Sequence, residues 1–191
     1  MKHRHFIINK PFGYLSQFVT NQGKQKNKKL LGELYDFPEG TMAIGRLDEQ
    51  SEGLLLLTTD GSVSEEVRCK EIEKEYYAQV DGEISEEALQ VLEKGVEIGF
   101  EGKKYLTQPC KAKKLDTYPS FPERSKKIRD ERHGPTRWVS IILTEGKFKQ
   151  VRKMTAAVGF PTLRLVRVRI GNILLEKMNA GDVVEVERFN L

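Results

Sequence analysis

A short charged segment between two apolar runs holds the first candidates for chemistry. Residues 46–52 read RLDEQSE, and the flanking runs Met42–Gly45 and Gly53–Thr59 are typical of short buried strands. Loops carried by rigid strands are frequent places for reactive groups. Asp48 follows Arg46 by two residues, so both side chains can face one site, and the chemistry would be catalysis by a carboxylate. Aspartate is also common in turns for backbone reasons alone, and the residues themselves leave both interpretations open.

Four carboxylates in this region suggest a second chemistry, that of a metal-dependent phosphohydrolase holding Mg²⁺. They are Asp48, Glu49, Glu52 and Asp60. The run Leu54–Leu57 separates Asp60 from the other three by the length of a strand, which disfavours a common metal site. The histidines and cysteines have no zinc spacing, and no P-loop motif occurs. We therefore expect neither a metal nor an organic cofactor.

Four motifs together resemble a known enzyme family. The segment 45–61, with GRLD followed by GLLLLTTDG, resembles the signature of RNA pseudouridine synthases of the RsuA/RluB/RluE/RluF family. Three further segments agree with that family in order and spacing: NKPFG at 9–13, KEY at 74–76 and LTEGKFKQVRKM at 143–154. The resemblance implies an α+β pseudouridine synthase catalytic fold, in which a mixed, mostly antiparallel sheet with flanking helices surrounds a central RNA-binding cleft.

The resemblance also implies a mechanism. Pseudouridylation breaks the bond between ribose and N1 of uracil, rotates the base and rejoins it through C5, so the base must leave its stack. By the resemblance, Asp48 is the essential carboxylate, which attacks the anomeric carbon, abstracts a sugar proton or adds to the uracil ring. Arg152 is then its cationic partner, and Tyr76 stacks on the flipped base and can take the C5 proton. From the residues alone, Arg152 fits a surface arginine on a basic helix and Tyr76 fits a core tyrosine, although we expect Tyr77 to be the core residue.

Further positions are expected to contact RNA, namely Arg46, Lys10, Leu47, Lys147, Lys149 and Lys153. Lys10, in the family's K-P-x-G motif, either supports the active-site loop or contacts RNA. Lys147 and Lys153 stand where the family usually has arginine. Both keep the charge but lose the planar guanidinium, which weakens the expectation for their phosphate contacts and leaves the catalytic step untouched.

The resemblance is strongest to the RluE branch, which acts on large-subunit ribosomal RNA. The core begins within ten residues of Met1, so we expect one catalytic domain over residues 1–191, with two sub-lobes around the cleft and no separate amino-terminal RNA-binding module. The proline-rich basic loop at 116–137 also fits this branch. The alternative is a non-catalytic RNA-binding or ribosome-assembly protein on the same fold, which predicts damage to the three catalytic positions, and all three are intact.

Composition and charge distribution indicate the cellular compartment and the kind of partner. The chain has 191 residues with 38% hydrophobic residues, and its longest apolar run, Leu54–Leu57, is far below the roughly 20 residues of a membrane span. A secretory signal is lacking and Cys69 and Cys110 cannot form a disulfide framework, so we expect a cytoplasmic protein. We also expect a monomer. Residues 1–32 carry seven Lys/Arg and no Asp/Glu, and residues 102–170 carry 18 against five. These basic segments either converge on one RNA-binding face or neutralise acidic segments elsewhere.

The elements that must position these residues follow from periodicity and capping. Strands are predicted at His5–Asn9, Met42–Gly45, Gly53–Thr59, Lys74–Val80, Trp138–Thr144, Leu163–Ile170 and Val183–Glu187. Helices are predicted from a Ser62 cap to Cys69, from a Ser85 cap to Lys94, and over 147–158 with Phe148, Val151, Met154 and Val158 on the apolar face. A phase slip at Leu165-Val166 suggests a bulge that aims Arg164 differently from Arg167 and Arg169. Residues 16–29 and 116–137 are predicted surface loops.

Overall fold

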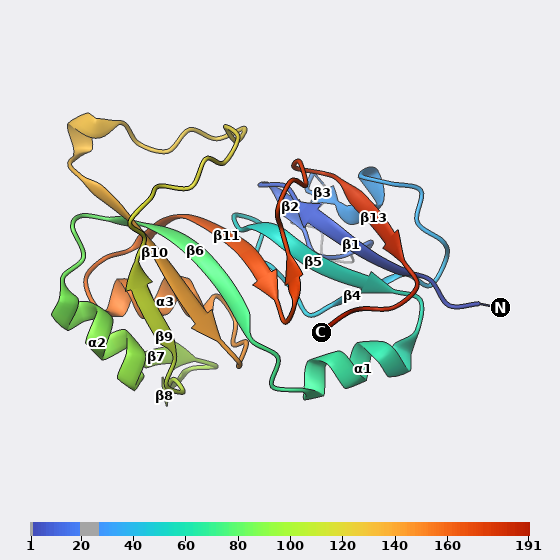
Figure 1. Cartoon of the computed structure of the whole chain (residues 1–191), viewed down its shortest axis with the longest axis horizontal. Coiled ribbons are helices and arrows are strands. Elements are labelled where there is room, and N and C mark those ends of the chain that lie inside the picture. Colours follow the sequence, from blue (N-terminus) through green and yellow to red (C-terminus); the bar gives the residue numbers. More distant parts are fainter. Residues whose placement is uncertain (1, 20–26) are drawn as a thin grey trace. The chain divides into compact units, whose positions relative to one another are not determined.

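Apolar strands organise the chain into two compact units, seen in a computed structural model that describes residues 2–19 and 27–191 (Figure 1). Unit 1 consists of Met1–Ile72 and Arg167–Leu191, and unit 2 consists of Glu73–Val166. Part of the predicted loop at 16–29, including Lys24 and Lys26, lies outside the described residues.

Unit 1 is built on three adjacent antiparallel strands with β5 at one side and β13 at the other. In spatial order they are β13 (Val183–Val186), β1 (His5–Lys10) and β5 (Glu52–Thr58), and β4 (Met42–Ile44) also pairs with β5. All seven residues of β5 are buried, which confirms that its continuous apolar run is covered on both faces. The core beside it holds Phe6, Ile8, Leu31, Leu55 and Leu57.

Short elements complete unit 1. The helix α1 (Gly61–Cys69) follows β5 along the chain. The remaining short elements are β2 (Tyr14–Leu15) and β3 (Lys29–Leu30), which pair in parallel, the 3₁₀ turn η2 (Leu31–Glu33), and β12 (Ile173–Leu174).

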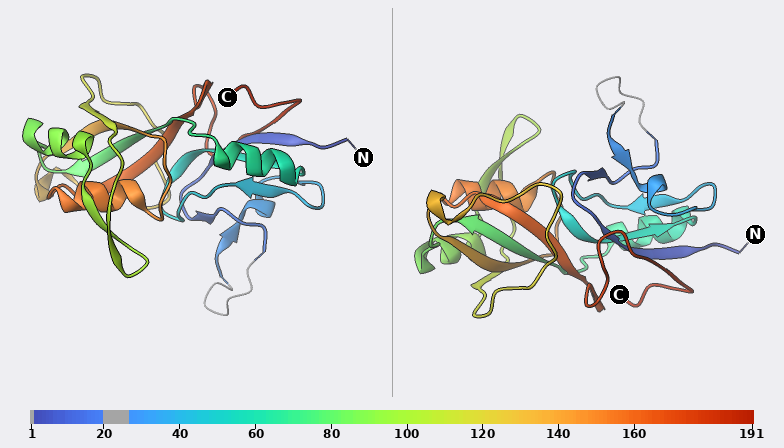
Figure 2. Two further views of the ribbon diagram at one scale, coloured as in Figure 1. Left: turned by 90° about the horizontal axis from the view of Figure 1, so that it is seen from below. Right: turned by 90° about the horizontal axis from the view of Figure 1, so that it is seen from above.

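Unit 2 is built on three antiparallel strands and a separate hairpin. The strands lie in the order β6 (Lys74–Asp81), β10 (Thr136–Leu143) and β9 (Lys111–Lys114). The hairpin of β7 (Glu97–Phe100) and β8 (Lys103–Leu106) projects from the unit beside α3 (Gln150–Ala157) (Figure 2). The helix α2 (Glu86–Lys94) lies against β9.

The strand β11 (Thr162–Ile170) contributes residues to both units, because the division falls between Val166 and Arg167. Its burial does not alternate: Arg164, Leu165, Val166 and Arg167 are buried in succession. The helices of the described residues are all too short or too polar to cross a membrane.

Helix boundaries were predicted well for two helices and less well for the third. Ser85 caps α2, as predicted, by accepting a hydrogen bond from the amide of Ala88. For α1 the cap is Asp60 instead of Ser62, because its carboxylate accepts from the amides of Ser62 and Val63.

The start of α3 was predicted wrongly. The helix begins at Gln150 because Lys149 adopts a left-handed conformation with φ of 52°. Residues 147–149 therefore lie outside the helix. Val151 and Met154 are buried as predicted, but Phe148 is 65% exposed and does not belong to the apolar face.

Tyr77 is also not the core tyrosine of β6. Tyr76, Ala78 and Val80 form the buried face, whereas Tyr77 is half-buried on the opposite face. There its ring lies 6.3 Å from the ring of Phe121, which belongs to the loop at 116–137. A loop residue therefore covers the face that the sequence pattern assigned to the core.

Candidate functional site

The carboxylate of Asp48 is held by its own loop. The backbone amide of Gln50 donates to Oδ1 over 3.0 Å, and the hydroxyl of Ser51 donates to Oδ2 over 2.7 Å. The amide of Ser51 also donates to the carbonyl of Asp48 over 3.0 Å, which closes a tight turn. Ser51 is fully buried and Asp48 is half-buried. The carboxylate is therefore fixed in orientation while part of it stays accessible.

The preceding loop holds this turn in place. The hydroxyl of Ser16 accepts from the amide of Leu47 and donates to its carbonyl, over 3.0 and 2.7 Å. The amide of Gly13 donates to the carbonyl of Glu49 over 2.8 Å. These three bonds hold the residues on either side of Asp48, so residues 13–16 fix the position of the Asp48 turn.

The buried side chain of Lys10 stabilises the segment that holds the Asp48 turn. Its side chain is 0% exposed, and its ammonium group donates to the carbonyls of Pro11 and Tyr14 over 2.9 and 2.7 Å. Burial lowers the pKa of Lys10 to about 8, against the opposing attraction of the Asp48 and Glu52 carboxylates. Of the two roles expected for Lys10, this geometry favours support of the active-site loop, because a fully buried ammonium group has no surface to offer RNA.

The two other predicted RNA-contacting residues of this loop differ in exposure. Arg46 is exposed next to Gly45, whose φ of 71° turns the chain. Leu47 is 6% exposed, and both of its backbone polar groups bond to Ser16, so its burial argues for a packing role rather than a contact with RNA.

The four carboxylates considered for Mg²⁺ have other partners. Asp60 caps α1, Glu49 pairs with Lys28 over 2.7 Å, and Glu52 is buried at the start of β5. Within residues 2–19 and 27–191, no group of three or more His, Cys, Asp or Glu side chains is arranged to hold a metal ion.

In unit 2, Tyr76 lies on the buried face of β6. It is 8% exposed and pairs in register with Ile141 of β10. Its burial on β6 fixes the ring, which suits a residue that offers one face to a flat partner.

Arg152 lies in the first turn of α3, where it is half-buried and donates to the carbonyl of Thr162 over 3.4 Å. Val151 and Met154 of the same helix are buried, and the half-buried Arg152 lies at the flank of this apolar face, where the sequence predicts it. Asp48 belongs to unit 1, and Tyr76 and Arg152 belong to unit 2. Their convergence on one site stays a prediction.

A carboxylate network fixes the segment that leads into α3. Glu145 accepts hydrogen bonds from the hydroxyl of Tyr105, the amide of Gln108 and the side-chain amide of Gln150, over 2.5, 2.8 and 2.5 Å. Gln150 in turn accepts from the amide of Lys147 over 2.9 Å. The bond to Glu145 raises the pKa of Tyr105. The network joins the turn after β8 to the start of the helix that carries Arg152.

Sequence reasoning missed the residues that orient these groups. Ser51 follows Asp48 by three residues, and an aspartate followed by such a serine is a signal for a side-chain-stabilised turn that was available in the sequence. The roles of Ser16 and Glu145 depend on contacts across 31 and 40 residues, to Leu47 and Tyr105, and no local pattern announces them.

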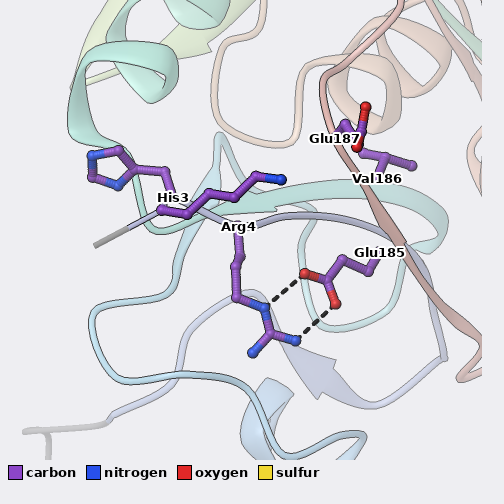
Figure 3. A pocket seen from close by; sticks show the side chains of 6 residues that line it. His3, Arg4, Glu185, Val186 and Glu187 are labelled. Atoms are coloured by element: carbon purple, nitrogen blue, oxygen red, sulfur yellow. Dashed lines mark hydrogen bonds and ion pairs between the residues drawn. The ribbon is translucent and has the colours of Figure 1, made fainter.

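A separate pocket of about 330 Å³ lies at the amino-terminal end of unit 1 (Figure 3). Its lining includes Arg4 and Glu185, which form a two-pronged ion pair with both distances at 2.7 Å. None of the predicted site residues lines this pocket.

Comparison with known proteins gives consistent matches. The family model described as RNA pseudouridylate synthase matches residues 4–157. The ribosomal large subunit pseudouridine synthase E of Vibrio parahaemolyticus serotype O3:K6 is 40% identical over 183 residues, covering 95% of this chain and 73% of that protein. The protein of the same name from Xanthomonas axonopodis pv. citri is 42% identical over 175 residues, covering 90% and 88%. The ribosomal large subunit pseudouridine synthase B of Bacillus subtilis is 31% identical over 185 residues, covering 95% and 67%.

Solved structures agree. A structure described as a crystal structure of pseudouridylate synthase has a TM-score of 0.75 and 26% identity, covering 96% of this chain and 70% of that chain. A Cbf5-Nop10-Gar1 complex has a TM-score of 0.57 at 15% identity, which is a likeness of fold alone. The predicted fold class, α+β with a mixed, mostly antiparallel sheet and flanking helices, is thereby confirmed.

Proposed function

Because this chain belongs to the RNA pseudouridylate synthase family, we propose that it converts a uridine of large-subunit ribosomal RNA into pseudouridine. The relatives named synthase E reach about 40% identity over nearly the whole chain, which confirms the resemblance to the RluE branch. Their name supplies the substrate class.

The observation that carries the proposal is the restrained carboxylate of Asp48, held at both oxygens by Gln50 and Ser51. A carboxylate that attacks carbon or accepts a proton must meet its target along a defined direction. Hydrogen bonds at both oxygens supply that direction. In the proposal Arg152 is the cationic partner of Asp48, and Tyr76 stacks on the flipped uracil and serves as the group nearest its C5 proton.

The reaction balances without a co-reactant. The bond between ribose C1′ and uracil N1 breaks, and a bond between C1′ and C5 forms after the base has rotated. The proton on C5 leaves, and N1 takes up a proton, so substrate and product are isomers. The protein has to hold the detached base, protect the sugar intermediate and move one proton, for which carboxylate, phenol and guanidinium groups are sufficient.

Several expectations accompany this proposal. Arg46, Lys147, Lys149 and Lys153 contact the RNA, and Lys10 and Leu47 hold the active-site loop from inside. We further propose that the two units are lobes of one catalytic domain, and that the protein acts in the cytoplasm as a monomer.

The test is to incubate the protein with protein-free ribosomal RNA and to map pseudouridine by carbodiimide-dependent stops of reverse transcription. Wild type is expected to produce a new stop in large-subunit RNA, and Asp48→Asn is expected to produce none. Glu49→Gln, which removes the neighbouring carboxylate, serves as the control and should keep the stop. Identical maps for wild type and Asp48→Asn would refute the catalytic assignment.

A further inference from the structure

Phe148 is a large apolar side chain that the fold leaves in solvent. It is 65% exposed, it lies in the segment between β10 and α3, and it is separated from Arg152 by only three residues. A single exposed apolar residue is ordinary on a protein surface. The surroundings of this one are not ordinary, because the ammonium groups of two lysines lie close to its ring.

Two lysines approach the ring of Phe148. The ammonium group of Lys149 lies 5.3 Å from the ring centroid, and that of Lys153 lies 5.5 Å away. Both distances are within the range of cation–π attraction. Two positive charges therefore lie close to the ring, while most of the residue stays exposed.

A second aromatic ring continues the pattern. Phe100, at the end of β7, lies 5.4 Å from the ammonium group of Lys147 and 5.9 Å from that of Lys153. Lys153 also donates to the carbonyl of Gly99 over 2.6 Å, which ties the hairpin to α3. Phe148, Phe100, Lys147, Lys149 and Lys153 thus form one surface, which we call the aromatic–lysine patch.

The backbone presents Phe148 at a cost. Lys149 has a φ of 52°, a left-handed conformation that is unfavourable for a residue with a Cβ. Strain of this kind persists where the surrounding structure imposes it, and it is concentrated at functional sites. Here α3 starts only after Lys149, so Phe148 lies outside the helix and its side chain is exposed.

We propose that the aromatic–lysine patch binds an unpaired segment of the RNA substrate, with one base stacked on Phe148 and the flanking phosphates held by the lysines. Aromatic faces next to positive charge are the usual means by which proteins bind single strands, since every base offers a face and every nucleotide a phosphate. The inference rests on the proposed function, because it assigns a contact to the RNA of that reaction. It adds a stacking residue outside the catalytic groups.

The test measures the dissociation constant for a single-stranded oligouridylate of about 12 nucleotides over a series of salt concentrations. Phe148→Leu keeps an apolar side chain and removes the aromatic face, and it should weaken binding about 5- to 160-fold at every salt concentration. Phe148→Tyr should bind like wild type. Lys149→Gln should instead reduce the salt dependence, by about 0.7 in the slope of log K against log salt.

Controls separate stacking from charge and from folding. Leu106→Ala changes a residue of unit 2 that is 67% exposed, and it should leave RNA binding unchanged. Inorganic polyphosphate carries charge without bases, so Phe148→Leu should bind it as wild type does, whereas Lys149→Gln should bind it more weakly. Equal affinities of wild type and Phe148→Leu for the oligouridylate, or no saturable binding by wild type, would overturn the inference.

The pseudouridine map of wild type reports separately on the proposed function. A wild type that modifies ribosomal RNA while Phe148→Leu binds the oligouridylate normally would refute the patch alone. A wild type that binds through Phe148 but forms no pseudouridine would refute the reaction and leave the patch intact.

Discussion

The backbone of Arg167 occupies the space that a side chain at Gly53 would need, and no other residue type fits at the glycine. A Cβ built on Gly53 would lie 2.3 Å from the carbonyl oxygen of Arg167 and 2.7 Å from its amide nitrogen. The glycine also has a φ of 105°, which disfavours residues with a side chain. Arg167 fastens the same place by donating from Nε to the carbonyl of Leu54 over 2.7 Å. The start of β5, directly after the Asp48 turn, therefore has a fixed position in unit 1.

Gly53→Ala is expected to destabilise the protein by about 2–5 kcal/mol, because it adds both backbone strain and a clash with main-chain atoms that cannot rotate away. Urea unfolding measures the loss. Gly61→Ala is the matched control: a Cβ there meets no atom within 4 Å and the residue lies in α1, so stability should stay the same or rise slightly. Similar unfolding free energies for the two variants would contradict the close approach.

Ser51→Ala should impair the chemical step more than RNA binding. The substitution removes the hydroxyl that orients Oδ2 of Asp48 and leaves the charge in place. We expect kcat to fall about 10- to 100-fold with KM nearly unchanged, since small errors in orientation have effects of this size. Ser85→Ala removes the cap of α2 at a cost of about 1 kcal/mol and should keep kcat, which controls for lost stability. A rise in KM with normal kcat would show that Ser51 serves binding instead.

The buried Lys10 predicts a distinctive pH dependence. Its pKa is about 8 in the folded protein and about 10.4 in an unfolded chain. Between these values the unfolded state binds more protons, so the contribution of Lys10 to the free energy of unfolding rises with pH, by at most about 1.4 kcal/mol per pH unit. Cys110 acts in the opposite direction, because burial raises its pKa to about 11 and the unfolded thiol loses its proton first.

Wild type and Lys10→Met both contain Cys110, so its contribution cancels in the difference between their unfolding free energies. The difference in unfolding free energy between wild type and Lys10→Met should therefore move in favour of wild type as the pH rises from about 8 to 10, by up to about 3 kcal/mol. Urea unfolding at a series of pH values measures it. A difference that stays constant over this range would show that Lys10 is not buried as a cation.

The loop at 116–137 should bind RNA through its exposed lysines and not through all of its basic residues. Arg129 pairs with Asp81 and donates to the carbonyl of Pro135, so it fastens the loop to unit 2. Lys126 and Lys127 are exposed. Replacing both with glutamine should reduce the salt slope of ribosomal RNA binding by about one to two without a change in stability.

The control for this double variant is Lys70→Gln with Lys177→Gln, two exposed lysines of unit 1 outside the basic segments. It should leave the slope as it is in wild type. Equal slopes for both double variants would show that Lys126 and Lys127 do not contact the RNA.

Local chemistry explains which parts of the fold were visible in the sequence. The continuous apolar run of β5 and the Ser85 cap of α2 are signals carried by a few adjacent residues, and both predictions are confirmed. The motif around Asp48 likewise marks a turn between strands. Two hydrogen bonds of Asp48, those from Gln50 and Ser51, come from within three residues of it, so this part of the site could be predicted from the local sequence.

The errors come from features that no local pattern encodes. Lysine is almost never fully buried, so the position of Lys10 contradicts its type and depends on the carbonyl groups that surround it. Alternation on β6 separated Tyr76 from Tyr77 correctly, but Phe121 of an irregular loop decides how the second face is covered. The apolar spacing of Phe148 matched a helix that a single left-handed residue, Lys149, prevents.

Lys149→Gly should separate stability from RNA binding. Glycine adopts the left-handed conformation without a penalty, so the variant should be as stable as wild type or up to about 1 kcal/mol more stable after the loss of chain entropy is included. It also removes one of the two cations beside Phe148, and its affinity for the oligouridylate should fall. Glu176→Gly relieves a similar conformation, with φ of 38°, in unit 1 and should change stability alone. Thermal unfolding and RNA titration of the two variants give the comparison. A Lys149→Gly protein that loses stability yet binds RNA normally would mean that Lys149 holds the entry to α3 and takes no part in the aromatic–lysine patch.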